Sequence, residues 1–82
     1  MSTGEIEVLY FASLRDAAGM GSEQVPMDAG DLAALYGRLQ RRHGFVFPRE
    51  RLRVAVDGVF ANWTDALRAG SVVAFIPPVS GG

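Results

Sequence analysis

"DLAALYGRLQRRH", residues 31–43, carries the clearest helix signal in the chain and decides which fold the flanking segments can form. Its apolar side chains recur at i, i+3, i+4 and i+7, the spacing of one buried face of an α-helix. They are Leu32, Leu35, Tyr36 and Leu39. Asp28 or Asp31 is the predicted N-cap, and Gly44 is placed to end the helix. We therefore expect one helix that packs its apolar face against a sheet.

Upstream of the helix, residues 5–12, "EIEVLYFA", alternate as the residues of a β-strand do. One face of this strand carries Ile6, Val8 and Tyr10, and the other carries Glu7, Leu9 and Phe11. If the first set faces the helix, Leu9 and Phe11 must point to the opposite face, because strand side chains alternate. The strand therefore predicts an apolar patch on the face that the helix leaves open.

A structured loop and a weaker strand connect this first strand to the helix. Residues 13–21, "SLRDAAGMG", predict a short helical turn that Ser13 caps and Gly19 ends. Residues 22–27, "SEQVPM", predict a second strand in which Pro26 suits an edge or a strand end. The two strands are expected to pair antiparallel.

Downstream of the helix, two apolar runs and a turn predict the rest of the sheet. Residues 53–62, "RVAVDGVFAN", surround Asp57 and Gly58, a pair typical of a type I′ hairpin turn. A turn at Gly70 then leads into a last strand over residues 71–76. The predicted order of the main elements is ββαβββ.

This order predicts an α+β domain of the β-grasp type. The right-handed preference of helical crossovers helps to select that topology, in which the last strand lies beside the first. We expect a mixed sheet of about five strands with one main helix on one face and the other face open. The domain is predicted to span residues 1–76, and residues 77–82 are predicted to form a flexible tail.

Composition narrows the classes of function. The chain has 82 residues, 49% of them hydrophobic, which suits one domain with its own core. It has no cysteine and a single histidine, His43, so neither a disulfide nor a bound metal or cofactor is expected. No secretory signal or apolar run of about 20 residues is present, and we expect a cytoplasmic protein without a membrane partner. A net charge of −1 gives no electrostatic footprint for nucleic acid.

The last eight residues, "FIPPVSGG", form an unusual ending. Pro77 and Pro78 favour an extended backbone, which lowers the entropy lost when a tail inserts into a partner. Gly81 and Gly82 lack Cβ atoms and therefore fit a narrow channel. A terminal Gly-Gly alone is more typical of a plain flexible tail, but together with the preceding strand and Pro-Pro step it indicates that the terminal carboxylate is a reactive group.

Three segments resemble a known family. "VLYFASLRDAAG" (8–19) and "LRAGSVVAFIPPVSGG" (67–82) resemble the two ends of the small, sulfur-carrying subunits of molybdopterin synthase, which belong to the ubiquitin-like β-grasp sulfur carriers. "RVAVDGVFAN" (53–62) is similar to their central hairpin, more loosely. The resemblance implies a sulfur carrier for molybdopterin (molybdenum cofactor) biosynthesis.

The resemblance also implies the chemistry of the tail. Gly82 would be adenylated with ATP by a partner and then converted to a thiocarboxylate that gives its sulfur to a pterin precursor. Pro77, Pro78, Val79, Ser80 and Gly81 would insert into the partner enzymes. The chain itself would be a non-catalytic subunit, since it has no catalytic set of its own and the partners make and break the bonds.

Three partners are implied by the same resemblance: a large catalytic subunit, a ubiquitin-activating-type adenylyltransferase and a sulfur donor enzyme. With a dimeric large subunit the complex would be a heterotetramer. Phe11, Phe60 and Ile76 fall on the family's docking positions for the large subunit. Exposed apolar patches on small soluble domains usually mark such sites. For Phe60, ordinary core packing remains the alternative.

The chain departs from the family at a few positions. Ser71 and Val72 stand where an acidic pair is usual, and Asp57 stands where asparagine is frequent. These changes lie near the last strand and leave the details of partner docking open.

Other residues have plainer interpretations. A local basic stretch could steer an acidic activating enzyme, but better fits a solvated helix end and loop; it comprises Arg41, Arg42, Arg49, Arg51 and Arg53. His43 is expected as a cation at the helix end, and Trp63 as a packing residue.

Alternative functions remain open at this point. Within the same class, the chain could carry sulfur for thiamin or for tRNA thiolation. From other classes come a ubiquitin-like modifier that forms isopeptide bonds with lysines of other proteins, and a non-covalent binding module with an inert tail. The chain has no lysine, so it cannot build chains on its own side chains.

Overall fold

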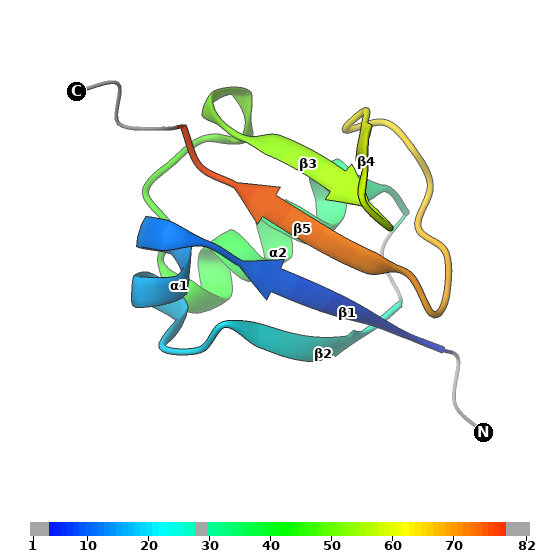
Figure 1. Ribbon diagram of the computed structural model, residues 1–82, viewed down its shortest axis with the longest axis horizontal. Coiled ribbons are helices and arrows are strands. Elements are labelled where there is room, and N and C mark those ends of the chain that lie inside the picture. Colours follow the sequence, from blue (N-terminus) through cyan, green and yellow to red (C-terminus); the bar gives the residue numbers. More distant parts are fainter. Residues whose placement is uncertain (1–3, 28–29, 79–82) are drawn as a thin grey trace.

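The computed structural model describes residues 4–27 and 30–78 (Figure 1). In chain order, the elements are β1 (Glu5–Tyr10), α1 (Ala12–Ala18), β2 (Ser22–Pro26), α2 (Leu32–His43), a short 3-10 helix η1 (Arg49–Arg51), β3 (Arg53–Val56), β4 (Val59–Ala61) and β5 (Val72–Ile76). The predicted ββαβββ order about the main helix is confirmed. The loop after β1 contains a helix of seven residues, α1, where only a helical turn is expected from the sequence.

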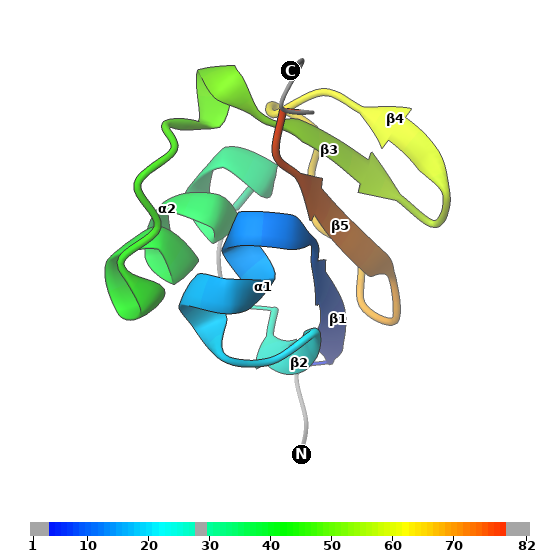
Figure 2. The same ribbon diagram turned by 60° about the vertical axis from the view of Figure 1, so that its left-hand side comes forward.

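The five strands form one mixed sheet in the order β2-β1-β5-β3-β4. β1 and β5 pair in parallel, with Val8 opposite Val73, and the other three pairings are antiparallel. α2 lies across one face of the sheet, and the opposite face carries no described helix (Figure 2). This is the predicted β-grasp arrangement, and it places the last strand beside the first, in the middle of the sheet.

The core lies between α2 and the sheet. All four apolar residues of the predicted helix face are buried. They meet the buried faces of β1 and β5, to which Ile6, Val8, Tyr10, Val73 and Phe75 belong. Each such aliphatic or aromatic side chain contributes about 1.5–3 kcal/mol by leaving water. Trp63 stacks on Phe75 with ring centroids 5.9 Å apart, so its predicted packing role is confirmed.

The ends of α2 follow the sequence signals. The Asp31 carboxylate accepts a hydrogen bond from the Ala34 N–H at 2.8 Å, which makes Asp31 the N-cap. Asp28, the other candidate, lies outside the described residues. Gly44 ends the helix with φ of 74°, and its N–H donates to the Gln40 carbonyl at 2.8 Å.

The prediction that Ser13 caps the first helical segment is wrong. β1 ends at Tyr10, two residues earlier than predicted, and α1 already begins at Ala12. Phe11 occupies the N-cap position without a side-chain hydrogen bond, and its carbonyl accepts from the Leu14 N–H at 3.0 Å. Ser13 therefore lies inside the helix, where its hydroxyl cannot cap it.

The predicted hairpin between β3 and β4 and the predicted turn before β5 are both confirmed. Asp57 and Gly58 have φ of 51° and 86°, the left-handed pair that a type I′ turn requires. Gly70 has φ of 83°, and its N–H donates to the Glu5 carbonyl at 2.8 Å, which fixes the entry into β5. β5 begins at Val72, one residue later than predicted. Nowhere in residues 4–27 and 30–78 is there a helix long and apolar enough to cross a lipid bilayer.

Candidate functional site

The central strand β5 leads directly to the C-terminal tail. β5 is flanked by β1 and β3 and ends at Ile76 (Figure 1). Pro77 is buried and Pro78 is exposed. Since proline fixes φ and lacks an N–H, these two residues cannot continue the hydrogen-bond ladder of the sheet. The carrier residue Gly82 and the insertion residues Val79, Ser80 and Gly81 lie outside the described residues, so their roles stay predictions.

An apolar cavity of about 640 Å³ lies at the root of the tail. Its lining comes from the junction of β1 and α1, from the loop after α2 and from the end of β5: Phe11, Ala12, Ser13, Phe47, Ile76, Pro77 and Pro78. Two of the three predicted docking residues, Phe11 and Ile76, therefore meet the first residues of the tail. No polar cluster suited to catalysis lines this cavity, and its walls are suited to an apolar side chain of a partner.

Ala12 forms part of the cavity wall and has φ of 50°. A left-handed conformation costs a residue with a Cβ atom about 1–2 kcal/mol. The sharp bend comes directly after Phe11, which follows the end of β1 and has a side chain that is 44% exposed. The surrounding fold thus holds an aromatic ring at the surface in spite of local strain.

Phe60 lies on the open face but outside the cavity. It is 64% exposed, so it is not a core residue. Its strand β4 is three positions away from β1 in the sheet. Phe60 pairs with Ala55 of β3, and Ala55 pairs in turn with Ala74 of β5. The small side chains of Ala55 and Ala74 make the middle of the open face shallow. The three predicted docking residues therefore lie on one side of the sheet at opposite margins of this shallow region.

The Arg53 guanidinium lies over the Phe60 ring, 5.4 Å from its centroid. Arg53 is also directly opposite Ile76 in the β3–β5 register, beside the root of the tail. In the sequence, Arg53 stands among other arginines of a basic stretch, and its place on this face is not predicted. The signal that could have revealed it is strand alternation, which puts residue 53 on the same face as Ala55.

The predicted basic stretch does not form one surface. Arg41 and Arg42 belong to the last turn of α2, on the covered side of the sheet, while Arg49 and Arg51 belong to η1. Arg42 lies 3.6 Å from a carboxylate oxygen of Glu23. Arg53 alone among the five lies on a strand of the sheet.

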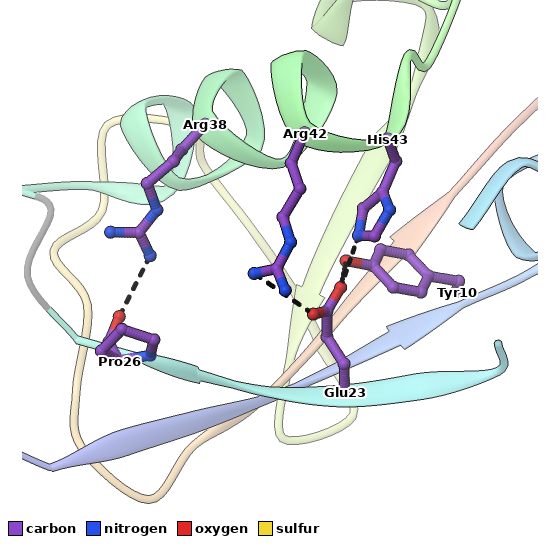
Figure 3. A network of polar contacts seen from close by, with 6 residues as sticks. All are labelled: Tyr10, Glu23, Pro26, Arg38, Arg42 and His43. Atoms are coloured by element: carbon purple, nitrogen blue, oxygen red, sulfur yellow. Dashed lines mark hydrogen bonds and ion pairs between the residues drawn. The ribbon is translucent and has the colours of Figure 1, made fainter. Parts of the chain in front are cut away.

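A cluster of polar side chains connects the edge strand β2 to the end of α2 (Figure 3). The Tyr10 hydroxyl donates to Glu23 Oε1 at 2.6 Å, and His43 Nε2 lies 2.6 Å from the same oxygen. The side chains of Glu23 and His43 are only 9% and 10% exposed. His43, expected from the sequence only as a cation at a helix end, is thus held inside this network.

The pKa values in this cluster follow from burial and mutual contact. Burial raises the pKa of the Tyr10 hydroxyl far above its ordinary value, and the hydrogen bond to the Glu23 carboxylate adds to the shift. Burial alone would raise the pKa of Glu23. Hydrogen bonds from Tyr10 and His43, with the charge of Arg42, outweigh burial and lower the pKa of Glu23. The cluster is a structural clamp on the far side of the sheet from Phe60.

The described part of the chain contains no group of three or more histidine, aspartate or glutamate side chains positioned to hold a metal ion. The features that gather around the tail are apolar and cationic. They suit recognition of another protein.

Comparison with known proteins identifies relatives over nearly the whole chain. The model of the ThiS family matches residues 8–82. The molybdopterin synthase sulfur carrier subunit of Escherichia coli is 31% identical over 80 residues, which cover 94% of this chain and 99% of the relative. The human protein of the same name is 34% identical over 84 residues, covering 95% of this chain and 94% of the relative.

Two of the solved structures that are similar to this chain carry different descriptions. SAMP1 of Haloferax volcanii, a small archaeal modifier protein, is similar with a TM-score of 0.79 and 29% identity, over 96% of this chain and 100% of that chain. A chain in the complex of subunits 1 and 2 of the molybdopterin-converting factor of Helicobacter pylori is similar with a TM-score of 0.66 and 25% identity, over 95% of this chain and 99% of that chain.

Proposed function

The chain belongs to the ThiS family, and from this premise we propose that it is a sulfur carrier protein, the small subunit of a molybdopterin synthase. The observation that carries the proposal is the course of β5. This strand lies in the middle of the sheet, ends beside an apolar docking cavity and continues directly into "PPVSGG". The tail thus follows a strand that is paired on both sides, next to a surface that a partner can bind.

The proposed reaction sequence begins with activation of the Gly82 carboxylate. A carboxylate oxygen is a poor leaving group, so the carboxylate first attacks the α-phosphate of ATP, which releases pyrophosphate and forms an acyl adenylate. A donor at the oxidation level of sulfide then attacks the carbonyl carbon, and AMP leaves with the electrons of the broken C–O bond. The product is a thiocarboxylate, whose sulfur attacks a carbon of the pterin precursor and displaces an oxygen leaving group. Water then hydrolyses the resulting thioester at its acyl C–S bond, which leaves the sulfur on the pterin and returns Gly82 to a carboxylate. No side chain of this protein takes part in these steps.

Three partner proteins are required by this sequence. A ubiquitin-activating-type adenylyltransferase uses the ATP, a sulfur donor enzyme supplies the sulfur, and the large catalytic subunit holds the pterin. The H. pylori relative in a complex of subunits 1 and 2 supports a two-subunit assembly of this kind. We assign the cytoplasm as the place of this chemistry and a heterotetramer with a dimeric large subunit as the working form.

Docking of the large subunit is proposed on the open face, through Phe11, Phe60 and Ile76. Phe11 and Phe60 are exposed aromatic side chains, and Ile76 joins them to the cavity at the root of the tail. Aromatic side chains are enriched at the centres of protein interfaces, where they bury large apolar areas. Docking here would hold the large subunit next to the point at which the tail leaves the sheet.

Reconstituted molybdopterin synthesis tests the function. The chain is mixed with the activating enzyme, ATP, a sulfur source, the large subunit and the pterin precursor, and cofactor formation is measured. A chain without Gly82 is expected to keep its thermal unfolding midpoint and lose all cofactor formation. Gly30→Ala, at a position where a Cβ meets no neighbour within 4 Å, is the control and should stay active. Full activity without Gly82 would contradict the proposal.

A protein modifier is the second candidate, and the similarity to SAMP1 favours it. The same activation would then end in an isopeptide bond between Gly82 and a lysine of another protein. Gel-shifted conjugates in cells that express the tagged chain, absent when Gly82 is deleted, would support this candidate. Sulfur carriage for thiamin or tRNA thiolation is distinguished from carriage for molybdopterin by supplying the thiamin precursor or the tRNA as sulfur acceptor in place of the pterin precursor.

A further inference from the structure

Arg53 presents an exposed cation on the otherwise apolar part of the open face. Its guanidinium lies over Phe60, and its strand position is opposite Ile76, so it is next to two of the proposed docking residues. Within residues 4–27 and 30–78, no carboxylate lies within ion-pair distance of Arg53. The segment around it, residues 49–53, holds three arginines and one glutamate and therefore has a net charge of +2.

The opposite end of the same face is acidic. Strand alternation puts Glu5 and Glu7 of β1 on this face, and Glu7 is directly opposite Val72. The Asp57 carboxylate in turn accepts a hydrogen bond from the Val72 N–H. Ile76, the residue opposite Arg53, is four positions after Val72 in β5, so the acidic end and Arg53 are separated by about 13 Å along the strand. The open face therefore has a charge gradient along the direction of β5.

Docking through Phe60 would cover Arg53. A guanidinium that stacks on an aromatic ring is attracted to the face of the ring and is held in one orientation. When a partner removes the surrounding water, the guanidinium loses its hydration, and this loss is offset only if the partner supplies acceptors. A carboxylate meets that need best, because its two oxygens match the parallel N–H groups of arginine.

We propose that Arg53 determines the specificity and orientation of docking: the large subunit presents a carboxylate to Arg53 at the tail end of the face and a cation to Glu5 and Glu7 at the other. The proposal rests on the function proposed above, because it assumes that the large subunit binds this face. A partner turned end for end would put carboxylate against Glu7 and cation against Arg53. The gradient thus admits only the orientation in which the tail meets the intended side of the large subunit.

Calorimetric titration of the full-length chain with the large subunit from the same cells tests the proposal. Arg53→Glu is expected to weaken binding at least ~10-fold, and Arg53→Gln by less, since Gln removes the cation without adding repulsion. Arg41→Glu makes the same charge change at an exposed position on α2, on the other side of the sheet, and should stay within about twofold of the original chain. Affinity of the original chain should fall with salt more steeply than that of Arg53→Gln.

The outcomes separate this proposal from the function on which it rests. If the original chain binds, Phe11→Arg abolishes binding and Arg53→Glu binds normally, the role of Arg53 is wrong and the docking face stands. If the original chain does not bind the large subunit at all, both are wrong. If Arg53→Glu binds the large subunit normally but no longer binds the activating enzyme, Arg53 serves the activating enzyme and the proposal is overturned. Should Arg53→Glu unfold, the salt dependence of binding by Arg53→Gln decides: a slope equal to that of the original chain would overturn the role of Arg53.

Discussion

Asp57 and Val72 are joined by two hydrogen bonds: the Asp57 carboxylate accepts from the Val72 N–H at 2.9 Å, and the Asp57 N–H donates to the Val72 carbonyl at 2.8 Å. Asp57 is the first turn residue of the β3–β4 hairpin, and Val72 is the first residue of β5. The pair therefore fixes the start of the strand that leads to the tail.

Asp57→Ala is expected to reduce the free energy of unfolding by about 1–3 kcal/mol, because it removes the acceptor for the Val72 N–H and leaves a Cβ-bearing residue at positive φ without the local preference of aspartate. Asp57→Asn keeps a side-chain oxygen and should lose less. Urea unfolding of the three chains measures the difference. Equal stability of Asp57→Ala and the original chain would exclude a structural role for this bond.

Loss of the Glu23 carboxylate should change the acid stability of the fold. The pKa of Glu23 is lowered in the folded chain, so the stability it contributes is fully present above its unfolded pKa of about 4.3 and is lost as the pH falls through the lower folded pKa. Glu23→Gln should be less stable at neutral pH and show a flatter decline from about pH 5 downward. Thermal unfolding across this range is the measurement. A parallel decline in both chains would place the acid sensitivity elsewhere.

The two aromatic residues on opposite sides of the sheet should respond differently to truncation. Trp63→Ala removes the ring that stacks on Phe75 in the core and is expected to cost about 2–4 kcal/mol of unfolding free energy. Phe60→Ala, at a side chain 64% exposed, should cost under about 0.5 kcal/mol. Denaturant unfolding compares the two. A large loss for Phe60→Ala would mean that this ring supports the fold and would weaken its assignment to docking.

Phe11→Arg is expected to weaken binding to the large subunit at least ~10-fold, because it places a charge in a patch that docking removes from water. Met20→Arg is the matched control, since Met20 is exposed to a similar degree, 40% against 44%, and does not line the cavity. Titration of both variants with the large subunit measures the effect. Similar losses for both would indicate a general effect of added positive charge.

The sequence predicts most of the fold because its local signals agree with one another. The buried stripe of α2 and the Asp57–Gly58 turn each have one favourable structure, and the structure confirms them. For the N-cap of α2 the sequence offers Asp28 or Asp31, and the structure selects Asp31. The start of α1 is different. Ser13 is a good cap by residue type, but the backbone of Ala12 turns into the left-handed region and starts the helix earlier, an effect of the surrounding sheet that residue preferences do not contain.

The candidate site is predicted in part. The tail and Phe11 stand out in the sequence by pattern and by residue type. The contact of Arg53 with Phe60 depends on the register of two strands, and the burial of Glu23 depends on the distance between β2 and α2. Contacts between residues far apart in the chain require the assembled sheet, and a one-residue shift in register would place Arg53 on the other face.

Sulfur carriage by Gly82 is tested by the intact mass of the chain before and after incubation with the activating enzyme, ATP and a sulfur source. We expect a mass gain equal to the exchange of one oxygen for one sulfur, located at Gly82 by fragmentation and absent without ATP. An unchanged mass, in a reaction where the same enzyme thiocarboxylates a known carrier, would contradict it.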